Sequence, residues 1–114
     1  MYSEEQYVRS LEQYWRSFGG KVFVLPQKLC LKYGVKAAKF LTHIHHGIEK
    51  KCGEFHEDRQ WIGGTYEQWS EQLCISDRTL RRIVKQLTDE GVILVKKLSR
   101  RDRTNFYTID YGAL

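Results

Sequence analysis

Four basic side chains between residues 78 and 85 form the part of this sequence best suited to binding chemistry. They are Arg78, Arg81, Arg82 and Lys85. A guanidinium group presents a planar fork of N–H donors that matches the oxygens of a phosphate or the O6 and N7 atoms of a guanine. Ser76 and Thr79 lie beside them and carry hydroxyl groups that can donate to phosphate oxygens. These residues favour a polyanion as the ligand, and the plainer alternative is an ordinary solvated helix face.

A second basic group follows and consists of Lys96, Lys97, Arg100, Arg101 and Arg103. Residues 76–103 contain nine Lys or Arg and four Asp or Glu, whereas residues 1–75 contain ten and nine. Most of the formal net charge of +5 therefore lies in the C-terminal segment. A one-sided positive excess is the electrostatic footprint of a polyanion binder. Nucleic acid is the commonest such ligand, and an acidic protein or a membrane surface is a less common one.

Histidines and a cysteine gather between residues 43 and 56, and we considered them as zinc ligands: His43, His45, His46, Cys52 and His56. The first three point in different directions on a helix and contain no i, i+4 pair. No second Cys or His pair stands at zinc-finger spacing, so we expect no metal and no cofactor. The strand–glycine–lysine arrangement of a phosphate loop is not present around Gly63 and Gly64. No Ser/His/Asp or paired-carboxylate set shares a site, so we expect no catalytic residues and no enzymatic activity.

The basic residues at 78–85 need a helix to position them, and the sequence from Ser76 to Gly91 predicts one. Ser76 is a good N-cap, Asp77 complements the helix dipole, and Gly91 can adopt the left-handed conformation that ends a helix. Apolar residues repeat at i, i+3, i+4 and i+7, which predicts one buried stripe. The stripe consists of Leu80, Ile83, Val84 and Leu87. At about 100° per residue, the basic residues point away from this stripe, with Arg81 on its flank.

A shorter helix is predicted immediately before this one, because Thr65 and Gln68 have the form of a capping box. Residues 65–90 thus contain a short helix, a tight connection and a longer helix with basic outer positions. This order is typical of a helix-turn-helix. Two β-rich segments with a polar loop between them follow. Residues 92–109 therefore predict a β-hairpin, which would form the wing of a winged helix.

The N-terminal half predicts further helices. Residues 3–18 predict an amphipathic helix with an aromatic and apolar stripe of Tyr7, Leu11, Tyr14, Trp15 and Phe18. This stripe either packs on the rest of the domain or forms the self-association surface of a homodimer, since large aromatic side chains are favoured at interfaces. The other predicted elements are a strand at 22–25, helices at 27–33 and 35–51, a loop at 53–60 and a short strand at 61–62.

A single domain accounts for the length of 114 residues. The expected fold class is α+β: a mostly helical winged helix-turn-helix with a C-terminal hairpin and extra N-terminal helices. The sequence contains no apolar run of membrane-spanning length and no secretory signal segment, so we expect a cytoplasmic, nucleoid-associated protein. Cys30, Cys52 and Cys74 are expected to be reduced, partly buried thiols.

Four segments resemble winged-helix proteins of phages, plasmids and integrated mobile elements. They are WIGGTYEQW at 61–69, SDRTLRRI at 76–83, residues 87–91, and RDRTNFYTIDY at 101–111. The resemblance covers roughly residues 21–111 and is most specific in the helix-turn-helix and wing. Many such proteins act in replication, and some are similar to the N-terminal domain of DnaD-type primosomal proteins. Such proteins often carry a C-terminal extension, so a chain ending at Leu114 is expected to be either a stand-alone module or an excised domain.

The resemblance implies that the second helix of the motif lies in the DNA major groove and that the wing touches the flanking backbone or minor groove. It further implies double-stranded DNA as the partner and a role in initiating the replication of a mobile element. A transcriptional repressor with the same contacts and a winged-helix module for protein interaction or dimerisation are the alternatives. The expected DNA-binding residues are Ser76, Arg78, Thr79, Arg81, Arg82, Lys85, Lys96, Lys97, Arg100, Arg101 and Arg103.

Overall fold

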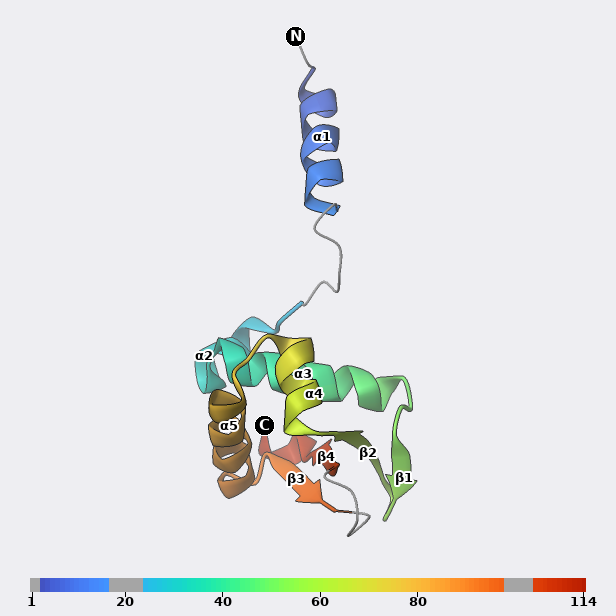
Figure 1. The fold of residues 1–114 in the computed structure, drawn as a ribbon, viewed down its shortest axis with the longest axis vertical. Helices are drawn as coiled ribbons and strands as arrows, with labels where there is room; N and C mark the ends of the chain where they lie inside the picture. Colours follow the sequence, from blue (N-terminus) through green and yellow to red (C-terminus); the bar gives the residue numbers. More distant parts are fainter. Residues whose placement is uncertain (1–2, 17–23, 98–103) are drawn as a thin grey trace.

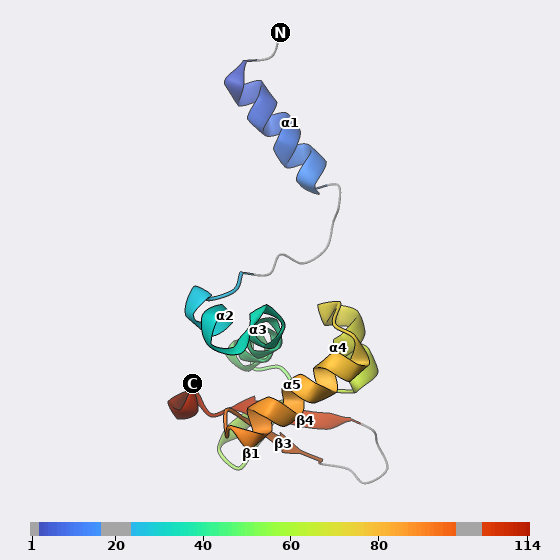
Figure 2. The same ribbon diagram turned by 90° about the vertical axis from the view of Figure 1, so that its left-hand side faces the viewer.

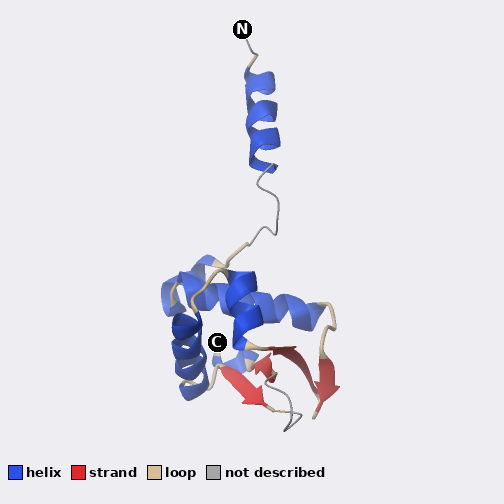
Figure 3. Cartoon of the chain, viewed as in Figure 1, coloured by secondary structure: helices blue, strands red, loops and turns tan. Residues whose placement is uncertain are grey.

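The computed structural model describes residues 3–16, 24–97 and 104–114, without the side chains of residues 14–16. Within these ranges the chain forms five α-helices, a short 3₁₀ helix and four strands (Figure 1, Figure 3). The helices are α1 (Glu4–Arg16), α2 (Gln27–Tyr33), α3 (Val35–Glu49), α4 (Tyr66–Leu73), α5 (Asp77–Asp89) and the 3₁₀ helix η1 (Tyr111–Ala113). The strands are β1 (Glu54–His56), β2 (Arg59–Gly64), β3 (Ile93–Lys96) and β4 (Asn105–Ile109). The predicted α+β class is confirmed.

The described strands form one antiparallel sheet in the order β1-β2-β4-β3. β3 and β4 are neighbours, with Val95 opposite Tyr107. β2 lies on the other side of β4, with Ile62 opposite the same tyrosine. β2 and β4 are about forty residues apart in the chain and lie side by side. Their pairing places the start of α4 next to the start of β4 in the C-terminal hairpin.

The β1–β2 hairpin corrects the prediction of a loop at 53–60. Glu57 and Asp58 both have positive φ values, 52° and 59°, so they form the kind of two-residue turn that matches the twist of the flanking strands. Such turns usually contain glycine or asparagine, and neither is present here. Phe55 is 69% exposed, so β1 also lacks the apolar alternation that signals a strand. The indole Nε1 of Trp61 donates to the His56 carbonyl at 2.8 Å and ties the two strands together.

The core is built around α3, which crosses the sheet (Figure 1). Phe40 on α3 is fully buried and makes edge-to-face contacts with Trp69 and Tyr107, at centroid distances of 5.8 and 5.6 Å. Because Trp69 lies on α4 and Tyr107 on β4, one aromatic cluster joins both α3 and α4 to the sheet. The apolar stripe predicted for α5 faces this core: Leu80, Ile83, Val84 and Leu87 are all buried.

Caps and a sharp turn fix α4 and α5 relative to each other. Thr65 Oγ1 accepts a hydrogen bond from the Gln68 amide at 3.1 Å, and Gln68 Oε1 accepts one from the Thr65 amide at 3.0 Å, so the predicted capping box is confirmed. Ser76 Oγ accepts from the Thr79 amide at 3.3 Å and caps α5. Cys74 links the two helices in a left-handed conformation with φ 55°. The Lys39 ammonium donates to the Leu73 carbonyl and anchors this turn on α3.

The predictions for the N-terminal helices agree with the structure better than the prediction for the segment between α1 and α2. The helices expected at 27–33 and 35–51 correspond to α2 and α3, but Val24 and Leu25 are not in a strand, and the rest of the segment expected at 22–25 lies outside the described residues. The expected helix at 3–18 is present as α1, which stands apart from the other elements (Figure 1, Figure 2). Tyr7, Val8 and Leu11 are 57, 47 and 50% exposed, so these side chains do not pack on the domain.

Gly64→Ala is expected to lower the free energy of unfolding by about 1–3 kcal/mol, because an added Cβ would enter the buried indole ring of Trp69. Urea denaturation provides the measurement. Gly112→Ala is the matched control: its added Cβ would find its nearest neighbour, Asp110 Oδ1, at 3.5 Å, which is ordinary contact. Equal stability of the Gly64 variant and the wild-type chain would contradict the tight packing of α4 against β2.

Candidate nucleic-acid interface

The outer face of α5 carries basic side chains that are exposed to solvent. Arg78, Arg82 and Lys85 lie on the side of α5 opposite its buried stripe, as predicted. Within the part of the chain that the structure describes, none of the three forms an ion pair or a side-chain hydrogen bond. No acidic side chain of the described residues therefore neutralises their charges, which suits an anionic ligand.

Arg81 differs from its neighbours because the protein holds it in place. Its Nε donates to Asp77 Oδ2 at 2.8 Å, and its guanidinium carbon lies 4.3 Å from the centre of the Tyr66 ring. The hydrogen bond to Asp77 raises the pKa of Arg81 above its ordinary value. Asp77 lies in the first turn of α5, and it also orients Arg81 toward the start of α4.

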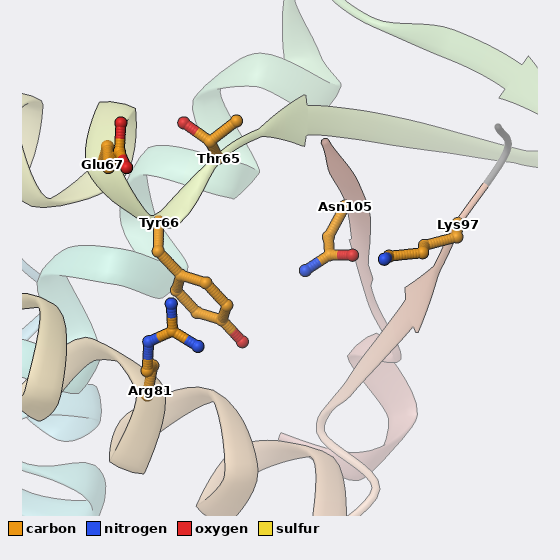
Figure 4. Close-up of a pocket in the computed structure, with 6 residues that line it drawn as sticks. All are labelled: Thr65, Tyr66, Glu67, Arg81, Lys97 and Asn105. Carbon is orange, nitrogen blue, oxygen red and sulfur yellow. The ribbon is translucent and has the colours of Figure 1, made fainter. Parts of the chain in front are cut away.

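A pocket of about 460 Å³ lies beside Arg81 (Figure 4). It is lined by Thr65, Tyr66, Glu67, Arg81, Lys97 and Asn105. Tyr66 and Arg81 form one wall, and Asn105 and Lys97 lie opposite them (Figure 4). The pocket therefore joins the first turn of α4, the flank of α5 and the arms of the C-terminal hairpin. A basic residue from α5 and a basic residue from the hairpin face the same space, which suits a phosphate group.

The phenol of Tyr107 is buried next to this pocket. Burial raises the pKa of Tyr107 well above its ordinary value, while Asn105 and the charge of Arg81 act in the opposite direction. The phenol is therefore neutral at physiological pH. Within the described residues, no hydrogen bond of ordinary geometry satisfies its hydroxyl oxygen.

Other predicted binding residues have different surroundings. Lys96 Nζ lies 2.8 Å from Glu57 Oε1 and 6.0 Å from the ring of Trp61, so it is turned toward the β1–β2 hairpin and is already paired. Ser76 and Thr79 form the cap of α5, and their hydroxyl oxygens are 2.9 Å apart. Arg100, Arg101 and Arg103 lie outside the described residues. The structure thus brings Arg81 and Lys97 together and separates Lys96 from them.

Tyr66, Asn105 and Tyr107 were not among the predicted site residues. The local sequence identifies Thr65 as a helix cap, but it does not show that Thr65 lies near Asn105. That proximity depends on the pairing of β2 with β4, which is a long-range contact. The register Gly64 opposite Asn105 is what positions the first turn of α4 beside the hairpin.

The histidines and cysteines have mainly structural contacts. The His43 ring meets Trp69 edge-on at 4.9 Å. His45 Nδ1 lies 2.8 Å from the Tyr111 hydroxyl, and its Nε2 lies 2.6 Å from Glu49 Oε1. No three His, Cys, Asp or Glu side chains gather as metal ligands in the described ranges. The free thiols of Cys52 and Cys74 are exposed and that of Cys30 is half-buried, so partial burial was a wrong prediction for the first two.

Comparison of the chain with protein-family models, with curated protein sequences and with solved structures gives no match. Among the helices of the described residues, none combines the length and the apolar character needed to cross a lipid bilayer.

Proposed function

We propose that this chain binds duplex DNA as a winged helix. In this arrangement α5 enters the major groove, and the hairpin of β3 and β4 contacts the adjoining backbone. The observation that supports the proposal is the convergence of Arg81 and Lys97 on one pocket, beside an α5 face whose other cations have no protein partner in the described chain. In this arrangement both α5 and the C-terminal hairpin present positive charge to a ligand.

The proposed contacts divide into two kinds. Arg78, Arg82 and Lys85 project from the outer face of α5, where a bidentate guanidinium can read a guanine in the major groove. Arg81, Lys97 and Asn105 line the pocket, where they would hold a backbone phosphate. The first turn of α4 also borders this pocket, through Thr65, Tyr66 and Glu67. Phosphate contacts fix the register of the protein on the duplex, and base contacts supply the sequence preference.

The biological process we propose is the initiation of DNA replication on a mobile element. Its support is the resemblance of the helix-turn-helix and hairpin segments to winged-helix replication proteins. A transcriptional repressor would use the same DNA contacts. Selection of bound duplexes from a random pool distinguishes the two roles, because a repressor dimer recovers palindromic sites with half-sites about one helical turn apart.

Binding to a random-sequence duplex is expected to weaken steeply with salt. If about six phosphates are neutralised, the log–log slope of affinity against salt concentration is near −5. Fluorescence anisotropy at a series of salt concentrations measures this slope. A flat response contradicts the proposal, because neutralising phosphates releases counterions.

Two adjacent lysines provide a matched pair for the same measurement. Lys97→Ala is expected to make the slope less negative by about one, because Lys97 lines the phosphate pocket. Lys96→Ala is expected to leave the slope nearly unchanged, because Lys96 is paired with Glu57. Equal effects of the two substitutions would show that the pocket does not hold a phosphate.

A protein-interaction module is the second candidate function. The exposed apolar side of α1 favours it, since Tyr7, Val8 and Leu11 are about half exposed. The predicted homodimer surface also included Tyr14, Trp15 and Phe18, whose side chains lie outside the described ones. A mobility-shift assay on mixed DNA, set beside a sizing experiment, discriminates this candidate from DNA binding.

A further inference from the structure

An apolar groove of about 300 Å³ lies between α2, α3 and the C-terminal end of the chain. Val24, Pro26 and Leu29 line it from the N-terminal side, and Ile109 and Leu114 line it from the C-terminal side. The exposed surface of its lining is almost entirely apolar, with His45, His46 and Tyr111 as its ionisable side chains. Such a groove, open to solvent, is suited to an apolar side chain or a helix face.

The apolar surface extends beyond the groove. Val24, Leu31 and Val35 are 75, 79 and 61% exposed, and α2 contributes no fully buried residue. Val24 lines the groove, and Leu31 and Val35 follow on the same segment of the chain, which ends at the start of α3. Basic side chains accompany this stretch, because Lys28 and Lys32 lie on α2 and Lys36 lies in the first turn of α3.

α1 has the complementary character. Tyr7, Val8 and Leu11 present an exposed apolar side. The helix also carries three acidic and two basic residues, a net charge of −1: Glu4, Glu5, Glu12, Arg9 and Arg16. A helix of 13 residues is only marginally stable in water unless its apolar face is covered. The same chain thus contains an amphipathic helix with an exposed apolar side and an apolar groove lined in part by a basic segment.

We propose that the groove receives α1 of a second copy of this chain. Both views show α1 directed away from α2 and α3 of its own chain (Figure 1, Figure 2), which leaves its apolar side free for another copy. Reciprocal docking gives a two-fold symmetric dimer by exchange of an identical element. This inference does not depend on DNA binding.

Sedimentation velocity of the full chain over a range of concentrations tests the proposal. The wild-type chain is expected to dimerise, and Leu11→Asp on α1 or Val24→Asp in the groove is expected to raise the dimer dissociation constant by about tenfold or more. Leu11 and Val24 are 50 and 75% exposed, so neither substitution should disturb the fold, and circular dichroism verifies this. Phe55→Asp is the control, because Phe55 is 69% exposed but lies on β1, outside the groove.

Mixing the two variants identifies the occupant of the groove. Leu11→Asp retains an intact groove and Val24→Asp retains an intact α1, so an equimolar mixture is expected to form heterodimers through one native contact. If α1 instead pairs with α1, Val24→Asp alone stays dimeric, which overturns the proposal. A wild-type chain that is monomeric at every concentration, as docking of α1 within one chain would produce, overturns it too.

Discussion

Arg82→Glu is expected to lower the affinity for duplex DNA by about a hundredfold at low salt. Arg82 is exposed on α5 between Arg78 and Lys85 and has no ion-pair partner in the described chain. Loss of one arginine–base contact costs about 1–3 kcal/mol, and a carboxylate placed against phosphates adds repulsion. A total near 2.7 kcal/mol corresponds to about a hundredfold in the dissociation constant. Fluorescence anisotropy with a mixed-sequence duplex measures this change.

The control for this substitution must change net charge equally without touching the proposed interface. Lys50→Glu meets that condition, because Lys50 is exposed at the C-terminal end of α3, away from α5 (Figure 1). Its effect on affinity is expected to be small and to disappear at moderate salt, since exposed charges beyond a Debye length are screened. Equal losses in the two variants would mean that DNA attraction is a property of overall charge. Wild-type affinity in Arg82→Glu would mean that α5 is not the binding helix.

The elements that sequence analysis predicted well are those whose signals are local. The N-cap of α5 at Ser76, its buried stripe and the capping box at Thr65 each depend on residues within one or two helical turns. The β1–β2 hairpin was missed because its turn at Glu57 and Asp58 uses left-handed residues that are neither glycine nor asparagine. A contact distant in the chain, the ion pair of Lys96 with Glu57, also joins this turn to β3.

The candidate site shows the same division between local and long-range information. Sequence analysis grouped Lys96 with Lys97, but neighbouring side chains at the end of a strand point to opposite faces of the sheet. Lys96 accordingly pairs with Glu57, and Lys97 lines the pocket with Arg81. Charge counts show that a segment is basic, but only the strand register shows which of its charges share a surface.

Phe40→Ala is expected to lower the free energy of unfolding by about 3–5 kcal/mol, a large share of the stability of a small domain. Phe40 is completely buried and contacts the rings of Trp69 and Tyr107, which themselves lie 5.8 Å apart. Truncation removes an aromatic ring from the junction of α3, α4 and β4 and leaves a cavity there. Urea denaturation measures the change, and Phe55→Ala, at a 69% exposed position, should alter stability by less than about 0.5 kcal/mol.

The same aromatic cluster supports the proposed phosphate pocket, so Phe40→Ala also tests whether this pocket contributes to DNA binding. Tyr66 follows Thr65 at the start of α4, Asn105 begins β4, and Phe40 packs between these two elements through Trp69 and Tyr107. A loosened cluster should therefore widen the pocket and weaken DNA binding even at temperatures where Phe40→Ala remains folded. Phe40→Leu fills most of the volume and should recover both stability and affinity. If stability falls in Phe40→Ala while the affinity of the folded fraction stays at the wild-type value, α5 alone carries the binding and the pocket does not contribute.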